Sequence, residues 1–127
     1  MILIKAFRDG DGDIVATWGN QQRPKVRAAI ASKMIYLRQQ KREGWIRPHY
    51  DSLRDGIGEV RFKVERINYR ALGFFGPGRN EFTFCFFATK TNVFDPRNAI
   101  DTAIERKLLV EQEDERYAVK LRMWGQE

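Results

Sequence analysis

The chain has 127 residues, of which 43% are hydrophobic and 13% aromatic, which is enough for one domain with its own core. Lys and Arg number 23 against 17 Asp and Glu. The resulting net charge of +6 favours a polyanionic partner, although proteins that bind no anion can carry a similar excess. No apolar run approaches the length of a membrane span, and residues 2–4 are too few for a signal-peptide core. We expect a single domain over residues 1–127, soluble, cytoplasmic and without membrane contact.

Charge and cysteine content narrow this further. Residues 23–47 carry eight Lys or Arg and one Glu, whereas residues 101–115 carry six acids and two bases, so one face should be strongly basic. Cys85 is the only cysteine and lies in the apolar run 82–87, which predicts a small core residue rather than a disulfide. A reducing compartment follows from this use of cysteine.

The first half of the chain predicts a strand followed by helices. Residues 2–7 form the expected strand, and the Asp-Gly-Asp-Gly sequence at 9–12 a turn. This turn resembles half of a calcium loop but lacks the downstream Glu that such a loop requires. A short helix is expected over residues 14–18, and a long one over 22–42. Apolar residues repeat at helical spacing along the long one, at Val26, Ala29, Ile30, Met34 and Leu37.

The second half predicts an antiparallel meander and a further helix. Strands are expected over residues 59–66, 69–75 and 81–90, with tight turns at 67–68 and 76–78. Pro96 is expected at the first turn of a helix, whose buried stripe would be Ala99, Ile100, Ala103, Ile104 and Leu108. A last edge strand is indicated by alternation at Tyr117, Val119, Leu121 and Met123.

Cationic and apolar residues alternate along the strand at 59–66. Successive strand side chains point to opposite faces, so Arg61 and Lys63 should project together while Val60, Phe62 and Val64 point into the core. Such a row of cations suits phosphate. On the pattern alone, a solvated sheet face is the more common explanation.

Aromatic residues and the histidine are expected to be structural. Tyr69 is predicted as a core aromatic, and the Phe residues between 74 and 87 as mostly buried, with one or two rings exposed. Some exposed rings could stack on RNA bases. His49 is the only histidine and has no Cys nearby, so we expect a loop residue and no metal site.

The string L-x-x-G-I-x-E-V-R at residues 53–61 is similar to the HigB-like, phage-derived branch of the RelE/ParE toxin superfamily. Further landmarks follow in order: Tyr69-Arg70-Ala71-Leu72, Phe74-Phe75, an apolar strand ending near Lys90, and Pro96 with Ile100, Ala103 and Arg106. The similarity covers residues 53–107. It implies an α+β, RelE-like fold, in which an N-terminal strand and helices pack on one face of a twisted antiparallel sheet of four to five strands, followed by a C-terminal helix.

The resemblance also implies a function. It is that of a toxin in a type II toxin–antitoxin system, acting as a metal-independent, ribosome-dependent mRNA endoribonuclease. Its partners would be a cognate antitoxin, the ribosome and mRNA, with no cofactor. The alternative is a non-catalytic member, either a ParE-like gyrase inhibitor or an inactive phage-derived relative that binds RNA or protein. A general RNA-binding module without toxicity is a third class.

Catalytic residues follow from the resemblance. Arg61 and Lys63 match the alternating basic positions of the family's first active-site strand, and Arg70 matches the basic residue of the next. Lys90 resembles the first member of a Lys-Lys pair, whose second position is Thr91 here. The family's C-terminal catalytic Tyr, His or Asp has no clear counterpart, since that neighbourhood holds Phe94 and Asp95.

The chemistry of RNA cleavage asks for these residue types. Negative charge accumulates on the phosphate as the 2'-hydroxyl attacks, so the guanidinium groups of Arg61 and Arg70 are assigned to stabilise it. Lys63 is the better candidate for the proton acceptor; neighbouring cations favour that role and nearby Glu residues oppose it. RNA or ribosome contacts are expected from Arg66, Lys33, Arg38 and Lys41, although the helical ones could merely keep the helix soluble.

Overall fold

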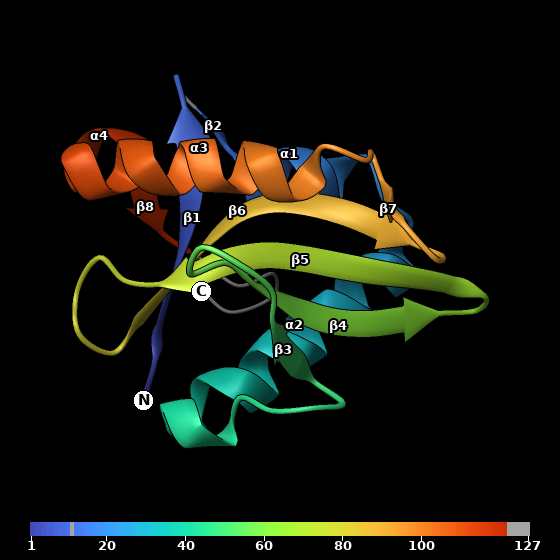
Figure 1. Cartoon of the computed structure of the whole chain (residues 1–127). Coiled ribbons are helices and arrows are strands. Elements are labelled where there is room, and N and C mark those ends of the chain that lie inside the picture. The colour runs from blue at the N-terminus through green and yellow to red at the C-terminus, as the bar shows by residue number, and fades with distance from the viewer. Residues whose placement is uncertain (11, 122–127) are drawn as a thin grey trace.

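The structure is a computed structural model that describes residues 1–10 and 12–121. Within these residues the fold is α+β, with four α-helices on one mixed sheet of eight strands (Figure 1). The helices are α1 (Ile14–Asn20), α2 (Pro24–Arg38), α3 (Ala99–Gln112) and α4 (Asp114–Tyr117). The strands are β1 (Leu3–Asp9), β2 (Gly12–Asp13), β3 (Tyr50–Ser52), β4 (Gly58–Val64), β5 (Ile67–Phe75), β6 (Glu81–Lys90), β7 (Phe94–Asp95) and β8 (Ala118–Lys120). They are ordered β2-β1-β6-β5-β4-β3, with β7 beside β6 and β8 beside β1.

The predicted meander is confirmed as the antiparallel strands β4, β5 and β6. Its first turn is displaced from the predicted position, because Val64 pairs with Ile67 and leaves Glu65 and Arg66 as the turn. Glu65 adopts the left-handed conformation that such a two-residue turn requires, with φ of 57°. The register between β5 and β6 shifts once, between Leu72 and Gly73.

The expectation of a purely antiparallel sheet of four to five strands is wrong. Strand β1 runs parallel to β6, with Leu3 opposite Glu81, and β8 pairs with β1 on its other side. Two α-helices and four strands separate β1 from β6 along the chain, which is ample for the crossover that a parallel pair needs. The additional strands β2, β3 and β7 have only two or three residues each, too few for a detectable alternation.

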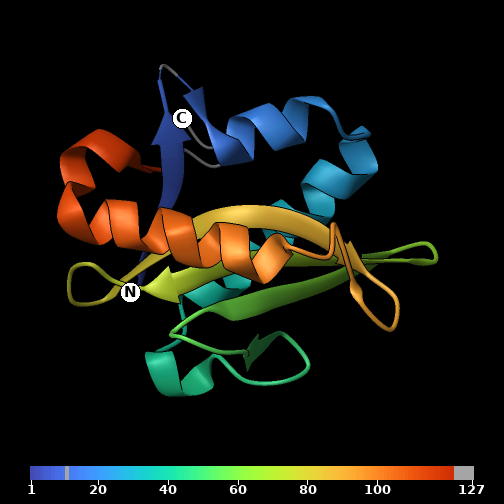
Figure 2. The ribbon, with the colours of Figure 1, turned by 45° about the horizontal axis from the view of Figure 1, so that its top comes forward.

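Helices cover both faces of the sheet, not one face as expected. Figure 2 shows α3 in front of the sheet, α2 behind it and α1 above it. The α2 side of the core contains Val60 and Ala71, whereas the α3 side contains Leu72 and Phe74. Apolar residues occupy consecutive positions in β5, as at 71 and 72, so both faces of this strand need an apolar cover.

Several helix boundaries and one stripe residue differ from the prediction. Helix α2 ends at Arg38 rather than at residue 42, and a 3-10 turn follows at Arg42–Gly44. Helix α3 begins at Ala99, because Pro96 lies in the turn before it and accepts a hydrogen bond from the Ala99 N–H at 3.1 Å. Leu108 is 50% exposed, and Val110 is buried in its place. The α3 stripe follows Ala99, Ala103 and Val110, and Leu108 lies on another side of the helix.

The ends of the chain agree in part with the sequence. The predicted turn near residues 9–12 fits the pairing of Arg8 with Asp13 and of Asp9 with Gly12, although Asp11 lies outside the described residues. The predicted final strand is present as β8, but it is shorter, since Tyr117 belongs to α4. Met123 lies outside the described residues.

Several core predictions are confirmed. Cys85 is buried, and burial raises the pKa of its thiol to about 12. Phe74, Phe82 and Phe84 are fully buried, while the remaining Phe rings of β5 and β6 are partly exposed.

In the part of the chain that the structure describes, no helix combines the length and apolar character needed to cross a membrane.

Candidate functional site

Cationic side chains project from one face of the meander. The pairing of β4 with β5 sets Arg61 directly opposite Arg70 and Lys63 opposite Asn68. Val60, the residue before Arg61, points to the other face of the sheet and is buried. The predicted alternation is therefore confirmed, and three of the four expected catalytic residues share one patch of sheet.

Lys90 joins them from the third strand. Arg70 lies opposite Ala88 of β6, and Lys90 is two residues further along that strand, so it points to the same face. Its ammonium lies over the ring of Phe94 in β7, 4.6 Å from the ring centroid. We call Arg61, Lys63, Arg70 and Lys90 the cationic patch.

A buried carboxylate lies between the two arginines of this patch. Glu59 is only 2% exposed, and its Oε2 lies 3.5 Å from Nε of Arg70 and 3.8 Å from Nε of Arg61. Arg70 is itself 8% exposed and donates from Nη1 to the Tyr69 carbonyl at 2.9 Å. Burial lowers the pKa of Arg70, and the Glu59 charge opposes that shift. The two guanidiniums and the carboxylate together carry a net charge of +1.

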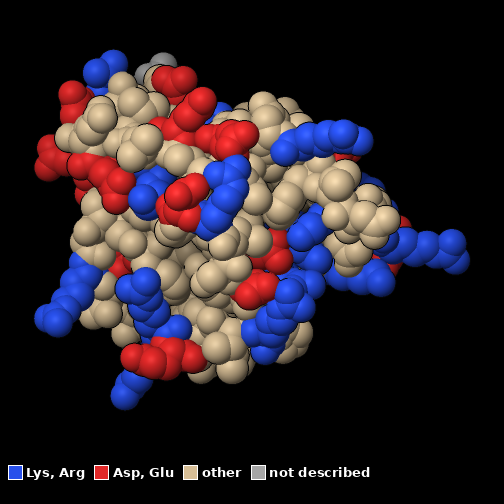
Figure 3. All heavy atoms as spheres, viewed as in Figure 1, with Lys and Arg blue, Asp and Glu red and all other residues tan. Residues whose placement is uncertain are grey.

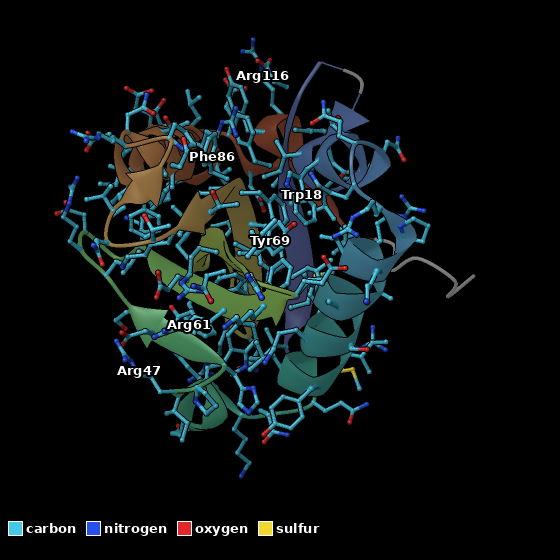
Figure 4. All side chains as sticks on the ribbon, turned by 90° about the vertical axis from the view of Figure 1, so that its right-hand side faces the viewer. Trp18, Arg47, Arg61, Tyr69, Phe86 and Arg116 are labelled. Atoms are coloured by element: carbon cyan, nitrogen blue, oxygen red, sulfur yellow. The ribbon has the colours of Figure 1, made fainter. Side chains whose placement is uncertain are left out.

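A second charge pair borders the patch on β3. Arg47 donates to Asp51 Oδ2 from Nε at 3.0 Å and from Nη2 at 2.7 Å. These hydrogen bonds lower the pKa of the Asp51 carboxyl, and the charges of Arg47 and Arg61 contribute. In Figure 4, Arg47 and Arg61 lie on the same side of the sheet, at its β3–β4 end. Asp51 is the residue opposite Glu59 in the β3–β4 pairing, so the charges form one continuous array.

Arg66 extends the basic surface at the β4–β5 turn, where it is exposed beside Lys63 and Glu65. Glu65 is turned away from the patch, since its Oε1 contacts Arg23 at 3.2 Å and Lys25 at 3.5 Å. Figure 3 shows Lys and Arg gathered toward the β4–β5 hairpin, whereas Asp and Glu are frequent over α3 and α4. The charge is therefore divided between two ends of the molecule, in agreement with the uneven sequence.

The three expected RNA contacts of the long helix lie elsewhere. Helix α2 packs on the face opposite the cationic patch, so Lys33, Arg38 and Lys41 are not brought together with Arg61. Lys41 is exposed beyond the end of the helix, whereas Lys33 and Arg38 are half-buried. The Arg38 carbonyl accepts a hydrogen bond from Ile2 N–H at 2.8 Å, which ties α2 to the start of the chain.

His49 has a specific partner, which the sequence did not indicate. The Lys33 Nζ lies 2.8 Å from His49 Nδ1, and the Tyr36 ring lies 4.6 Å from the imidazole. Burial lowers the pKa of both His49 and Lys33, and the Lys33 charge lowers that of His49 further. Since an ammonium can only donate, this contact requires a neutral imidazole with Nδ1 as acceptor.

Tyr69 is a core residue, as predicted. Its ring stacks on Phe62 at 5.1 Å and meets the edge of Trp18 at 6.1 Å, on the face away from the cationic patch. Figure 4 shows Tyr69 and Trp18 together between the sheet and α1. Tyr69 therefore supports β5 from behind and is not part of the patch.

The patch is suited to bind anions. Its side chains supply up to four positive charges on adjacent strands, and guanidinium groups match phosphate oxygens in pairs. Among residues 1–10 and 12–121, no three His, Cys, Asp or Glu side chains gather in a way that could hold a metal ion. Sequence reasoning missed the Arg47–Asp51 pair and the burial of Glu59. Only Glu59 left a signal, since it precedes Arg61 by two positions and shares its face.

These observations define an α+β protein with a cationic patch on a helix-covered sheet. The family model described as phage derived protein Gp49-like (DUF891) matches residues 18–108, which include all four residues of the patch. The chain belongs to this Gp49-like, phage-derived family. No curated protein and no solved structure matches the chain.

Proposed function

We propose that this protein is the toxin of a type II toxin–antitoxin system and cleaves ribosome-bound mRNA without a metal ion, as RelE- and HigB-like toxins do. The observation that carries the proposal is the pairing of Arg61 with Arg70 on adjacent strands, with Lys63 and Lys90 on the same face. Membership of a phage-derived family agrees with the resemblance to the HigB-like branch.

The proposed reaction uses the patch around one phosphodiester. The 2'-hydroxyl loses its proton, its oxygen forms a bond to the adjacent phosphorus, and the bond from phosphorus to the 5'-oxygen breaks. Arg61, whose side chain is 24% exposed, presents its guanidinium to the phosphate oxygens, with Arg70 beside it. Lys90 adds a further positive charge. Lys63, the most exposed of the four, accepts the 2'-hydroxyl proton as the free amine, and the departing 5'-oxygen takes a proton from water.

Contacts outside the patch would hold the RNA and the ribosome. Arg66 lies at the hairpin turn next to Lys63, where it would extend the phosphate track by one contact. Lys33, Arg38 and Lys41 lie on the α2 side, so they would contact ribosomal RNA and not the cleaved linkage. A cognate antitoxin would hold the activity in check.

The test is expression of the protein in bacteria without any neighbouring gene, followed by mapping of mRNA 5' ends. Growth arrest with new 5' ends inside translated messages is expected for the natural chain. Both effects should disappear in Arg61→Ala, which removes a partly exposed guanidinium from the patch. Arg70→Ala is a second variant, although Arg70 is buried and its loss also affects folding.

The matched control is Arg116→Ala, which removes the same group from α4. Arg116 is exposed and lies at the opposite end of the molecule from Arg61 in Figure 4. This variant should arrest growth and cleave mRNA like the natural chain. Cleavage that survives Arg61→Ala, or that is lost equally in Arg116→Ala, would refute the assignment of the patch.

A second candidate is a non-cleaving relative, either a ParE-like gyrase inhibitor or an RNA- or protein-binding descendant. Arg70 favours it, because this guanidinium is almost fully buried and already bonds to the Tyr69 carbonyl. Thr91 in place of a second Lys also favours it. Growth arrest with DNA damage and no new 5' ends would support gyrase inhibition. Salt-dependent RNA binding without arrest would support the binding protein.

A further inference from the structure

Glu59 is a buried carboxylate whose contacts are unusually incomplete. Its Oε1 has no hydrogen-bond partner among the described residues, and the same holds for the Arg70 Nε. Its other oxygen, Oε2, lies 3.5 and 3.8 Å from the Nε atoms of Arg70 and Arg61, longer than hydrogen bonds. A buried carboxylate with weak contacts costs stability, so a structural role alone does not account for it.

We propose that Glu59 is a positioning residue, which holds the guanidiniums of Arg61 and Arg70 side by side so that the charges of both act on the same phosphate. Like charges directly opposite each other in an antiparallel pair repel. Glu59 shares a face with Arg61 on β4 and lies opposite Leu72, the second residue after Arg70 on β5. A carboxylate at that point attracts both guanidiniums at once.

The direction of approach leaves the outer nitrogens of Arg61 available for phosphate, whereas Nη1 of Arg70 already donates to the Tyr69 carbonyl. Glu59 faces the Nε atoms, and no hydrogen bond engages the outer nitrogens of Arg61 in the described part of the chain. These outer nitrogens are the ones that can grip phosphate oxygens in pairs. Glu59 and the phosphate would therefore contact different nitrogen atoms of Arg61, so the positioning group does not compete with the ligand.

The charge balance identifies the ligand class. Two guanidiniums and one carboxylate carry +1, and one phosphodiester carries −1, so the bound cluster would be neutral where Arg70 is almost fully buried. Without Glu59 the pair would carry +2. A single phosphodiester linkage of RNA thus matches the site, and this part of the inference rests on the proposed function.

Glu59→Gln distinguishes positioning from simple attraction. The substitution keeps the side-chain size and raises the net charge by one, so simple attraction predicts tighter RNA binding. Positioning predicts weaker binding, by about tenfold, since a geometry that lets both arginines act together is lost. The probe is a fluorescein-labelled single-stranded RNA oligonucleotide, titrated at several salt concentrations.

Glu65→Gln is the matched control, because it removes an equal charge in the turn that follows the same strand, without touching the arginine pair. It should bind the RNA as tightly as the natural chain, or more tightly. Glu59→Asp is a second site variant that keeps the charge and shortens the reach, and it should also weaken binding. Equal or tighter binding by Glu59→Gln would overturn the proposal.

A measurement on the arginines themselves separates this inference from the proposed function. NMR signals of the Arg61 and Arg70 Nε–H groups should be narrow and slow to exchange in the natural chain and in Glu65→Gln. In Glu59→Gln they should broaden and exchange at least severalfold faster. If these signals behave as expected but the natural chain neither binds nor cleaves RNA, the proposed function fails and positioning stands. Unchanged signals in Glu59→Gln would overturn positioning whatever the RNA does.

Discussion

Arg61 of β4 and Arg70 of β5 lie directly opposite each other, and the buried carboxylate of Glu59 lies within 4 Å of both. Arg61 is the more exposed of the two, and Arg70 is almost fully buried. Arg61 is therefore accessible to a large ligand, while the buried Arg70 adds a second positive charge next to it. The two positions should respond differently to substitution.

Replacing Arg61 by Lys should reduce mRNA cleavage by about 100-fold while leaving the fold intact. Lysine keeps the charge but not the planar fork that binds two phosphate oxygens, and loss of one such donor lowers rates to about that extent. The measurement is the rate of cleavage of ribosome-bound mRNA by the purified protein. Arg116→Lys in α4 is the control and should retain the full rate. A near-normal rate for Arg61→Lys would mean that charge alone suffices.

Replacing Gly73 by Ala should destabilise the protein by about 2 kcal/mol, because overpacking a closely packed site costs about that much. A Cβ at this position would collide with the Thr83 carbonyl oxygen and with the Phe82 ring, at the point where the β5–β6 register shifts. Urea unfolding measures the effect. Gly12→Ala is the control, since its Cβ would meet only the Thr17 hydroxyl at 3.6 Å. Equal stability of the two variants would contradict the packing described here.

Acid should weaken the fold through His49. Burial lowers the pKa of this imidazole below its ordinary 6.5, and the Lys33 charge lowers it further, so the native state binds a proton less readily than the unfolded chain. Unfolding then takes up a proton between the two pKa values. This contribution to stability is complete above about pH 6.5 and is lost as pH falls through the native pKa.

The measurement for His49 is the melting temperature between pH 7.5 and 5. The natural chain should lose stability over this range, and His49→Gln, which cannot titrate, should lose less. Other groups titrate equally in both proteins, so the difference between the two curves isolates the imidazole. Parallel curves would show that the contact between Lys33 and His49 does not restrict protonation.

Cys85 should not react with thiol reagents in the native protein. Burial raises the pKa of its thiol to about 12, and only the thiolate is nucleophilic. After incubation with iodoacetamide at pH 8, mass spectrometry should find the thiol unmodified. In the denaturing control, with about 8 M urea added, the thiol should be fully modified. Rapid labelling without denaturant would show that the α3 side of the core opens readily.

Local periodicity was sufficient for the centre of the fold and for most of the cationic patch. Alternation over β4 placed Arg61 and Lys63 on one face because strand geometry depends on neighbouring residues only. The consecutive apolar residues Ala71 and Leu72 indicate that β5 is buried on both faces and therefore has helices on both. That interpretation holds only if neither face of the strand meets solvent, which the local sequence does not state. The first turn was predicted two residues too late, because Glu65 and Arg66 are not among the residue types that usually form turns.

Features that depend on distant residues could not be predicted. The parallel pairing of β1 with β6 joins residues far apart in sequence, and no local pattern specifies that partner. The same applies to the contact between Lys33 and His49 and to the Arg47–Asp51 pair beside the patch. The sequence placed Glu59 on the same strand face as Arg61, but its burial arises only when β3, β4 and β5 assemble.

The position of β1 between β6 and β8 has a consequence for biosynthesis. Strand β1 is held by β6 and β8, both of which are synthesised after it, so β1 keeps an unpaired edge until those strands have been made. Such long-range closure makes folding slow compared with that of a meander alone. The β4–β6 hairpins, with their arginine pair, can assemble early, whereas the sheet around them is completed last.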